Sequence, residues 1–362
     1  MRRKTLDDRP ATGKIDRENM LQVLEETPET YERAYTAAMK SDTLPHALPR
    51  PTSNLALIGM GGSAISADIL KDWLFSSQIP IEIVRGSQLP GSITAETCAL
   101  VASYSGQTAE TLRALREARE RKSRIACIAS GGELITIGRE SGLPHVQVRS
   151  GLQPREALPD LLAASMAVLV KWGICNDESV LVELRTVGEQ LGVLRKKIGF
   201  QRPHARNPAK QLAVRLHDTI PFIYTAQLLA AAGRRFKNQL NENSKVLAKF
   251  EALPEMLHNE VQSWEMLRED SYADCVSFVL LRGCEANDET EKFDRLAPLI
   301  RQAGSRKVYV ISLKFPTRLA TVLGTIYFCD YVSFYLAILR GIDPTPITTI
   351  QTLKRSARAS GS

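Results

Sequence analysis

A glycine-rich loop near the start of the chain could hold an anion. In "LALIGMGGSAISADIL" a predicted strand ends at Gly59, and Gly61 and Gly62 follow before a predicted helix begins at Ser63. Glycine allows sharp backbone turns and lets an anion approach exposed N–H groups, and the dipole of the following helix strengthens that attraction. The loop therefore predicts a binding site for a phosphate group or a dinucleotide.

Binding of a dinucleotide would require a further residue after the next strand. Gly59, Gly61 and Ala64 fit the spacing G-x-G-x-x-G/A, but NAD binding also calls for an acid at the end of the next strand. The next strand, "IEIVRG", places Glu82 within the strand and Arg85 at its tip. NAD therefore fits poorly, whereas NADP and an oxidoreductase activity stay open.

A second loop favours a phosphate monoester. In "LVASYSGQTAETL" a strand is again followed by a loop and a helix, and the loop offers the hydroxyls of Ser103, Ser105 and Thr108. Hydroxyls and backbone N–H groups together suit a compact phosphate. Loops at the carboxyl ends of neighbouring parallel strands can converge on one ligand. The simpler alternative is that these hydroxyls only cap helices.

A carboxylate in "LNENSK" is a candidate base. Glu242 lies between Asn241 and Asn243 and is followed by Ser244 and Lys245. Nearly every residue is polar, so burial in an apolar core cannot explain the stretch. The pattern fits an exposed helix face with a Glu242–Lys245 pair. It equally fits a carboxylate held for proton transfer, with the asparagine amides orienting it or binding a sugar.

The elements that carry these residues predict an α/β protein with two tandem domains. Apolar runs such as "CALVASYSG" and "RIACIAS" alternate with helical patterns, which indicates parallel sheets covered by helices on both faces. The pattern restarts after "FQRPHARNP" with the strand-like "TIPFIYTAQ" and "CVSFVLLRG". We expect N-terminal helices over 1–45 and domains over 46–200 and 201–362.

Composition excludes several classes of protein. The chain has 362 residues, a net charge of +7 and six cysteines. The basic residues are mixed with nearly as many acids, so nucleic acid is not an expected partner. No CxxC pair or metal-ligand cluster is visible, which predicts reduced cysteines, no metal and a cytoplasmic protein.

The start lacks the apolar stretch of a signal peptide. The apolar run 319–339 carries Asp330 at its centre, so we expect a buried helix rather than a membrane span.

The two loops resemble the phosphosugar-binding motifs of sugar isomerase (SIS) domains. Further segments are similar to the bifunctional phosphoglucose/phosphomannose isomerase family, in order from about residue 15 to residue 355. These segments are "KIDRENM", "GLQPREAL", "NQLNENSK", "LHNE" and "DPTPITTIQTLK". The chain departs from the family pattern at Gln107, where asparagine is usual, and at Ser66 and Ala67, which replace a glycine pair.

The resemblance implies a homodimer that interconverts fructose 6-phosphate with glucose or mannose 6-phosphate without a cofactor. It implies a catalytic group of Glu242 as the base, His258 as the ring-opening residue reaching across the dimer, and Arg155 and Lys354 near the sugar. It implies phosphate binding by Gly61, Gly62, Ser63, Ser103, Ser105 and Thr108.

Elementary chemistry supports these assignments to different degrees. Moving a proton between C2 and C1 through a cis-enediol needs one carboxylate placed over both carbons. Ring opening needs a group that titrates near neutrality, as histidine does, and His258 lies in the same segment as Glu242. A fixed guanidinium at Arg155 would stabilise the enediolate. Lys354 lies in a basic C-terminus of the kind that is usually solvated.

The main alternative is a sugar-phosphate sensor that has the same loops but no chemistry. A sensor of this kind would carry an effector domain such as a helix-turn-helix, and the N-terminal 40 residues are too short and too acidic for one. Isomerisation of amino-sugar phosphates is a further alternative, but it would normally come with an amide-transfer domain that we do not find here.

Overall fold

The computed structural model describes residues 2–44, 52–269, 273–283 and 287–359. The chain forms two compact units. Unit 1 comprises Met1–Glu25, Val193–Lys314 and Leu323–Ser362, and unit 2 comprises Glu26–Gly192 and Phe315–Val322. The predicted boundary between residues 45 and 46 lies outside the described residues.

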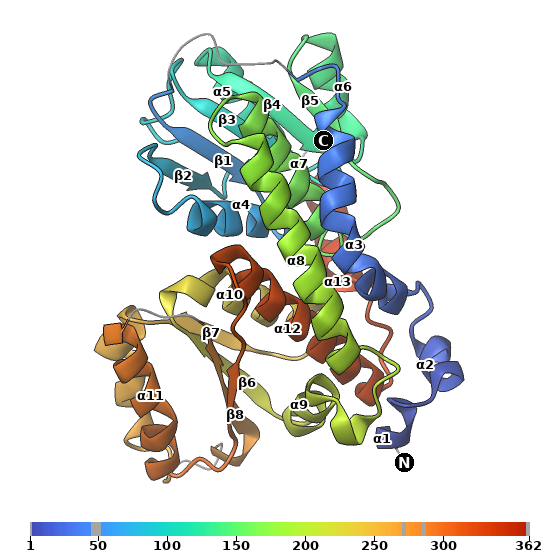
Figure 1. Cartoon of the computed structure of the whole chain (residues 1–362), viewed down its shortest axis with the longest axis vertical. Helices are drawn as coiled ribbons and strands as arrows, with labels where there is room; N and C mark the ends of the chain where they lie inside the picture. Colours follow the sequence, from blue (N-terminus) through green and yellow to red (C-terminus); the bar gives the residue numbers. More distant parts are fainter. Residues whose placement is uncertain (1, 45–51, 270–272, 284–286, 360–362) are drawn as a thin grey trace. The chain divides into compact units, whose positions relative to one another are not determined.

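The described part of unit 2 holds a five-stranded parallel sheet in the order β2-β1-β3-β4-β5. The central strands β1 and β3 are buried at every residue, because helices lie against the sheet on both faces (Figure 1). The strands are β1 Leu55–Gly59, β2 Ile81–Val84, β3 Cys98–Ala102, β4 Arg124–Ala129 and β5 His145–Gln147. The helices are α4 Gly62–Trp73, α5 Ala109–Glu120, α6 Gly132–Glu140 and α7 Leu158–Lys171.

The sheet of unit 1 repeats this order. Its described strands are parallel and arranged β7-β6-β8-β9, which is the order of the first four strands of the other sheet. The strands are β6 Ile220–Thr225, β7 Lys249–Ala252, β8 Val276–Arg282 and β9 Val308–Ser312. The helices include α1 Arg2–Thr5, α2 Arg9–Ile15, α9 Pro208–Leu216, α10 Ala230–Glu242, α11 Asn287–Gln302 and α13 Thr348–Ala359. The predicted fold class, two tandem parallel sheets flanked by helices, is confirmed.

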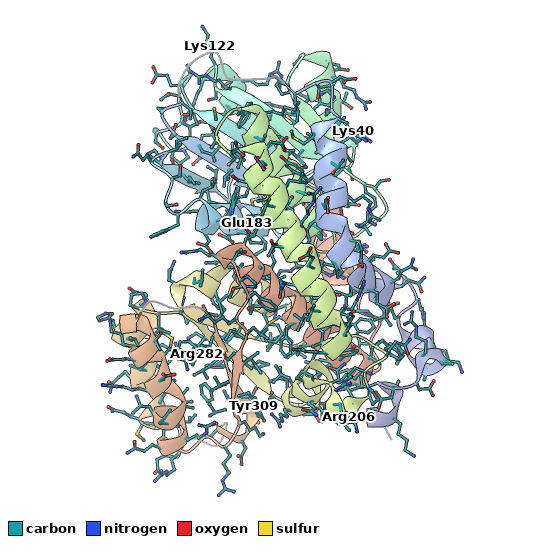
Figure 2. All side chains as sticks on the ribbon, viewed as in Figure 1. Lys40, Lys122, Glu183, Arg206, Arg282 and Tyr309 are labelled. Atoms are coloured by element: carbon teal, nitrogen blue, oxygen red, sulfur yellow. The ribbon has the colours of Figure 1, made fainter. Side chains whose placement is uncertain are left out.

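Aromatic side chains fill the core against the second sheet. The rings of Tyr224 on β6 and Phe278 on β8 lie 5.9 Å apart, and Trp264 lies within 6.3 Å of both. Tyr309 lies on β9 (Figure 2), and the guanidinium of Arg215 of α9 lies 5.5 Å from the centre of its ring. Burial of such large rings supplies much of the stability of a sheet of this size.

Three long helices among the described residues continue from one unit into the other. They are α3 Met20–Met39, α8 Asp177–Ile198 and α12 Arg318–Arg340. Helix α12 is long and apolar enough to cross a membrane, but its most apolar window is entirely buried in the protein. The sequence predicted this burial from the acid at its centre, Asp330.

The motif "KIDRENM" has a structural explanation. Asp16 caps the start of α3 by accepting hydrogen bonds from the backbone N–H groups of Met20, at 2.8 Å, and Leu21, at 2.9 Å. Burial raises the pKa of Asp16, and the two backbone hydrogen bonds oppose that rise.

Candidate active site

The first glycine-rich loop joins the end of β1 to α4. Gly61 precedes the helix with a φ of 53°, a backbone conformation that residues other than glycine adopt at a cost. A side chain at Gly62 would place its Cβ 2.9 Å from the carbonyl of Pro154. Glycine is therefore required at Gly62, because another loop lies directly against it.

The hydroxyl of Ser63 joins the first loop to the second. Ser63 is buried, and its Oγ accepts a hydrogen bond from the backbone N–H of Tyr104 at 3.1 Å. The backbone carbonyl of Ser63 accepts in turn from the hydroxyl of Ser66 at 2.7 Å. One of the residues that departs from the family pattern thus supports the first loop.

The second loop joins the end of β3 to α5. The hydroxyls of Ser103 and Thr108 are 3.0 Å apart, while Ser105 is exposed and accepts from the N–H of Gln107 at 3.3 Å. Thr108 occupies the capping position of α5 without a side-chain capping bond. The simpler alternative for this hydroxyl, ordinary helix capping, is therefore not what the structure shows.

A third loop, which the sequence analysis did not identify, lies against the second. It follows β4 and contains Gly131 and Gly132. A Cβ at Gly106 would lie 1.9 Å from the carbonyl oxygen of Gly131, and one at Gly132 would lie 2.5 Å from that of Ser105. The paired glycines at the end of another predicted strand were the signal for this loop.

The segment that carries Arg155 lies against both loops. The N–H of Leu152 donates to the hydroxyl of Tyr104 at 2.8 Å, and the backbone of Pro154 and Arg155 lies against Gly62. The Arg155 side chain is 2% exposed. The structure therefore brings together the segments that carry all the predicted phosphate-binding residues and Arg155.

Glu242 is the last residue of α10 in unit 1. It is half-buried and lines a pocket of about 860 Å³. The walls of this pocket come from the end of α10, from residues 245–248 and from the turn before α13. The structure thus places the candidate base at the wall of a cavity that has room for a small molecule.

A buried polar network fixes α10 against α12. Arg235 forms an ion pair with Asp330 at 2.8 Å, and Gln239 donates to the same carboxylate at 3.0 Å. One helical turn further on, Asn243 donates to the hydroxyl of Ser333 at 2.9 Å. Residues 235, 239 and 243 recur every four positions, so they share one face of the helix.

The centre of "LNENSK" is buried on polar partners rather than forming an exposed helix face. Asn243 is 1% exposed and Ser244 is fully buried, with the Ser244 hydroxyl donating to the carbonyl of Ser333 at 2.7 Å. Asn241 donates to the carbonyl of Val246 at 2.7 Å. Buried polar groups need hydrogen-bond partners. The hydrogen bonds of Asn241, Asn243 and Ser244 fix the backbone on either side of Glu242.

His258 and Lys354 are both exposed. His258 ends the short helix Glu255–His258, and Lys354 lies in the middle of α13. Their roles stay predictions. Among the residues that the structure describes, no three His, Cys, Asp or Glu side chains form a group that could hold a metal ion.

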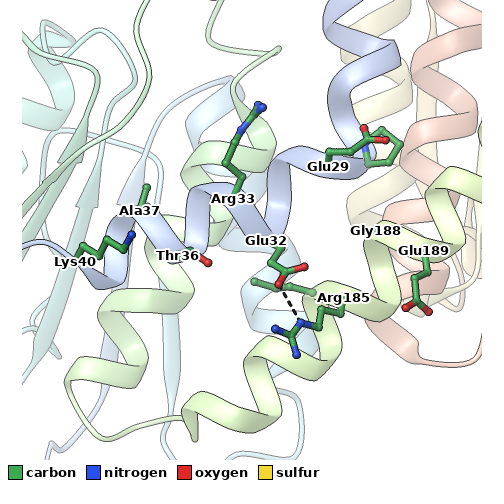
Figure 3. A pocket seen from close by; sticks show the side chains of 11 residues that line it. Glu29, Glu32, Arg33, Thr36, Ala37, Lys40, Arg185, Gly188 and Glu189 are labelled. Carbon is green, nitrogen blue, oxygen red and sulfur yellow. Dashed lines mark hydrogen bonds and ion pairs between the residues drawn. The ribbon is translucent and has the colours of Figure 1, made fainter.

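A larger pocket of about 910 Å³ in unit 2 contains none of the predicted site residues. It lies between α3 and α8, where Glu32 points toward Arg185 and forms an ion pair at 2.9 Å (Figure 3). Charges of both signs line it, and a Cβ at Gly188, another lining residue, would lie 2.9 Å from the carbonyl oxygen of Pro28. Its size alone therefore does not identify it as the reaction site.

Comparison with known proteins agrees with this geometry. The chain matches the SIS domain model over residues 50–141 and the model of the bacterial phospho-glucose isomerase C-terminal SIS domain over residues 205–356. The tagatose-6-phosphate ketose/aldose isomerase from Escherichia coli has a similar structure, with a TM-score of 0.66 at 15% identity over 89% of this chain and 93% of that chain. The fold and its loops define a protein built from two SIS domains.

Sequence relatives identify the family. The chain is 31% identical to a bifunctional phosphoglucose/phosphomannose isomerase from Caldicellulosiruptor bescii, over 83% of this chain and 88% of the relative. It is 32% identical to one from Aquifex aeolicus, over 85% of this chain and 91% of the relative. The chain belongs to the bifunctional phosphoglucose/phosphomannose isomerase family, as the resemblance predicted.

Proposed function

We propose that this protein is an aldose-ketose isomerase that interconverts fructose 6-phosphate with glucose 6-phosphate and mannose 6-phosphate. The observation that carries the proposal is the match to relatives named bifunctional phosphoglucose/phosphomannose isomerase. The match covers 88% and 91% of the length of two of these relatives. It favours the enzyme over a sugar-phosphate sensor.

The phosphate site is proposed at the loop edge of unit 2. Ser63 and Tyr104 join the two loops, and α4 begins at Gly62, directly after Gly61. Helix N-termini attract anions because their first N–H groups have no partner within the helix. The hydroxyls of Ser103, Ser105 and Thr108 would add hydrogen bonds to the phosphate oxygens.

Glu242 is proposed to move the proton between C2 and C1. Its carboxylate would take the proton from C2 of the open-chain aldose, leaving a cis-enediolate with its charge on O1. The proton of the C2 hydroxyl would pass to O1 through the cis-enediol, and Glu242 would return its proton to C1 to give the ketose. One base serves both carbons because they are adjacent, and no electrons leave the sugar. The anchored residues next to Glu242 hold its backbone, which keeps the base in place for both transfers.

The remaining site residues receive supporting roles. The guanidinium of Arg155 is proposed to stabilise the charge that develops on the enediolate oxygen, since a cation held in a buried position acts there without rearrangement. His258 is proposed to open the sugar ring, and Lys354 is proposed to contact the sugar.

A coupled assay of the purified protein tests the reaction. Fructose 6-phosphate is supplied, and formation of both glucose 6-phosphate and mannose 6-phosphate is followed. Glu242→Gln should lower kcat by about 10²-fold or more, in line with the usual contribution of a general base. Retention of most of the activity in this variant would exclude Glu242 as the base. Sugar phosphate binding without turnover by the wild-type protein would support the sensor instead.

We also propose that the protein is a cytoplasmic homodimer in which His258 serves the partner's site. Mixing Glu242→Gln and His258→Asn subunits tests this arrangement. Random pairing should restore about a quarter of the wild-type activity, because half of the dimers then contain one intact site. If each subunit uses its own His258, the mixture stays inactive.

A further inference from the structure

Lys245 lies three residues after the end of α10 at Glu242 and has an unusual backbone conformation. Its φ is 54°, a conformation that residues other than glycine and asparagine adopt at a cost of about 1 kcal/mol or more. Glycine or asparagine commonly fills this position at a helix end. A lysine at this position is therefore expected to contribute something that the smaller residues cannot.

The ammonium group of Lys245 binds backbone carbonyls from two segments. It donates to the carbonyl of Glu242 at 2.6 Å. It also lies 3.3 Å from the carbonyl of Pro344 and 3.4 Å from that of Asp343. The last carbonyls of a helix have no partner within the helix, and a cation there also opposes the negative end of the helix dipole.

The two segments line the same pocket. Glu242, Lys245 and Asp343 all line the cavity of about 860 Å³, together with residues 346–350. The turn at Asp343 and Pro344 leads directly into α13, which carries Lys354. A single side chain thus connects the end of the helix bearing the candidate base to the segment that leads to the second predicted site residue.

We propose that Lys245 is a positioning residue that holds the carboxylate of Glu242 and the start of α13 at a fixed separation. The inference rests on the proposed isomerase function. Lys245 acts on the reaction through Glu242: it fixes the backbone from which the base projects and takes no proton from the sugar.

Lys245→Asn removes the ammonium group while keeping a residue that tolerates this backbone conformation. We expect kcat to fall by about 10-fold to 10²-fold, because a displacement of about 1 Å can cost that much. KM for fructose 6-phosphate should stay within about twofold of the wild-type value. A kcat for Lys245→Asn that equals the wild-type value, while Glu242→Gln lowers kcat by about 10²-fold or more, would overturn the proposal.

The primary isotope effect with glucose 6-phosphate deuterated at C2 separates misplacement from partial unfolding. A misplaced base slows proton transfer itself, so the isotope effect on kcat should rise in Lys245→Asn. A smaller folded fraction lowers kcat but leaves the isotope effect unchanged, and that result would count against the proposal.

Lys122→Asn is the matched control. Lys122 also follows a helix, has a φ of 60° and is exposed, and it lies in unit 2 (Figure 2). This variant makes the same substitution in the same backbone conformation, so wild-type kcat and isotope effect are expected.

Hydrogen exchange tests the structural connection even if the protein does not turn over these sugars. Backbone amides over residues 341–350 should exchange faster in Lys245→Asn than in wild type, since their connection to α10 is lost. Unchanged exchange there would overturn the proposal. An inactive wild-type protein would overturn the isomerase function, whichever result exchange gives.

Discussion

The hydroxyl of Ser63 accepts a hydrogen bond from the backbone N–H of Tyr104 at 3.1 Å, and both residues are buried. This contact connects loops whose residues are 41 positions apart in the sequence. Because the Tyr104 hydroxyl also accepts from Leu152, the same residue connects the second loop to the segment of Arg155. The shape of the proposed phosphate site thus depends on one serine and one tyrosine.

Replacing Ser63 by alanine should weaken substrate binding. The buried N–H of Tyr104 would lose its partner, at a cost of about 1–3 kcal/mol, and the second loop would move. We expect KM for fructose 6-phosphate to rise by about tenfold or more. Ser165→Ala is the matched control, since Ser165 is also buried but donates only within α7, to Leu161. Equal KM values in the two variants would contradict the role given to Ser63.

Replacing Gly62 by alanine should damage the site through the neighbouring loop. The new Cβ would lie 2.9 Å from the carbonyl of Pro154, closer than such atoms normally approach, so the segment carrying Arg155 must shift. We expect kcat/KM to fall by about 10²-fold. Gly86→Ala provides the comparison, because a Cβ at Gly86 would have no neighbour within 4 Å. If the two variants have similar kinetics, the contact is not functional.

Replacing Asp330 by alanine should destabilise unit 1. The guanidinium of Arg235 would remain buried without its carboxylate, and breaking a buried ion pair in this way costs about 3–5 kcal/mol. Urea unfolding followed by circular dichroism measures the change. The control, Glu133→Ala, breaks the exposed ion pair with Arg116 and should change stability by less than about 1 kcal/mol. A similar small effect for Asp330 would show that the network contributes little.

Asp72 should make the stability of unit 2 depend on pH. Burial raises the pKa of Asp72 from 3.8 to about 6, Asp68 adds to the rise, and Arg318 opposes it. Because the folded protein binds this proton more tightly than the unfolded chain, its contribution to stability is lost as pH rises from about 4 to about 6. Asp72→Asn should therefore raise the unfolding temperature by roughly 2–4 °C at pH 7.5 and leave it unchanged at pH 4.

The control for this experiment is Asp42→Asn, an exposed carboxylate of the same unit. Its effect on the unfolding temperature should be small at both pH values. An Asp72→Asn variant that is no more stable than wild type at pH 7.5 would contradict the assignment.

The parallel sheets could be predicted because their central strands are apolar throughout. Strand β7 was missed, since its residues Lys249–Ala252 are half-buried and include a lysine and a glutamate. Edge strands of this kind lack both the apolar run and the strict alternation that mark a strand. The two loops that carry the proposed phosphate-binding residues were found because glycines and hydroxyls follow predicted strands. The third loop was missed although Gly131 and Gly132 give the same signal.

The polar network around Glu242 could not be predicted from spacing. Asp330 was recognised only as an acid in an apolar helix, and its partner Arg235 lies 95 positions away in the sequence. The polarity of Asn243 and Ser244 left an exposed helix face and a fixed carboxylate equally open, because polarity normally marks the surface. Which polar residues are buried depends on partners that only the tertiary structure supplies.

The division of the chain into units has a consequence for protein synthesis. Residues Phe315–Val322 belong to unit 2, where Thr317 donates to Glu183 at 2.9 Å and Arg318 lies 5.1 Å from the ring of Phe75. Domains generally fold as units while the chain leaves the ribosome. Unit 2, whose sheet is synthesised first, must therefore wait for a segment that is made after all the described strands of the second sheet. A ribosome stalled before residue 315 would hold a nascent chain in which neither unit is complete.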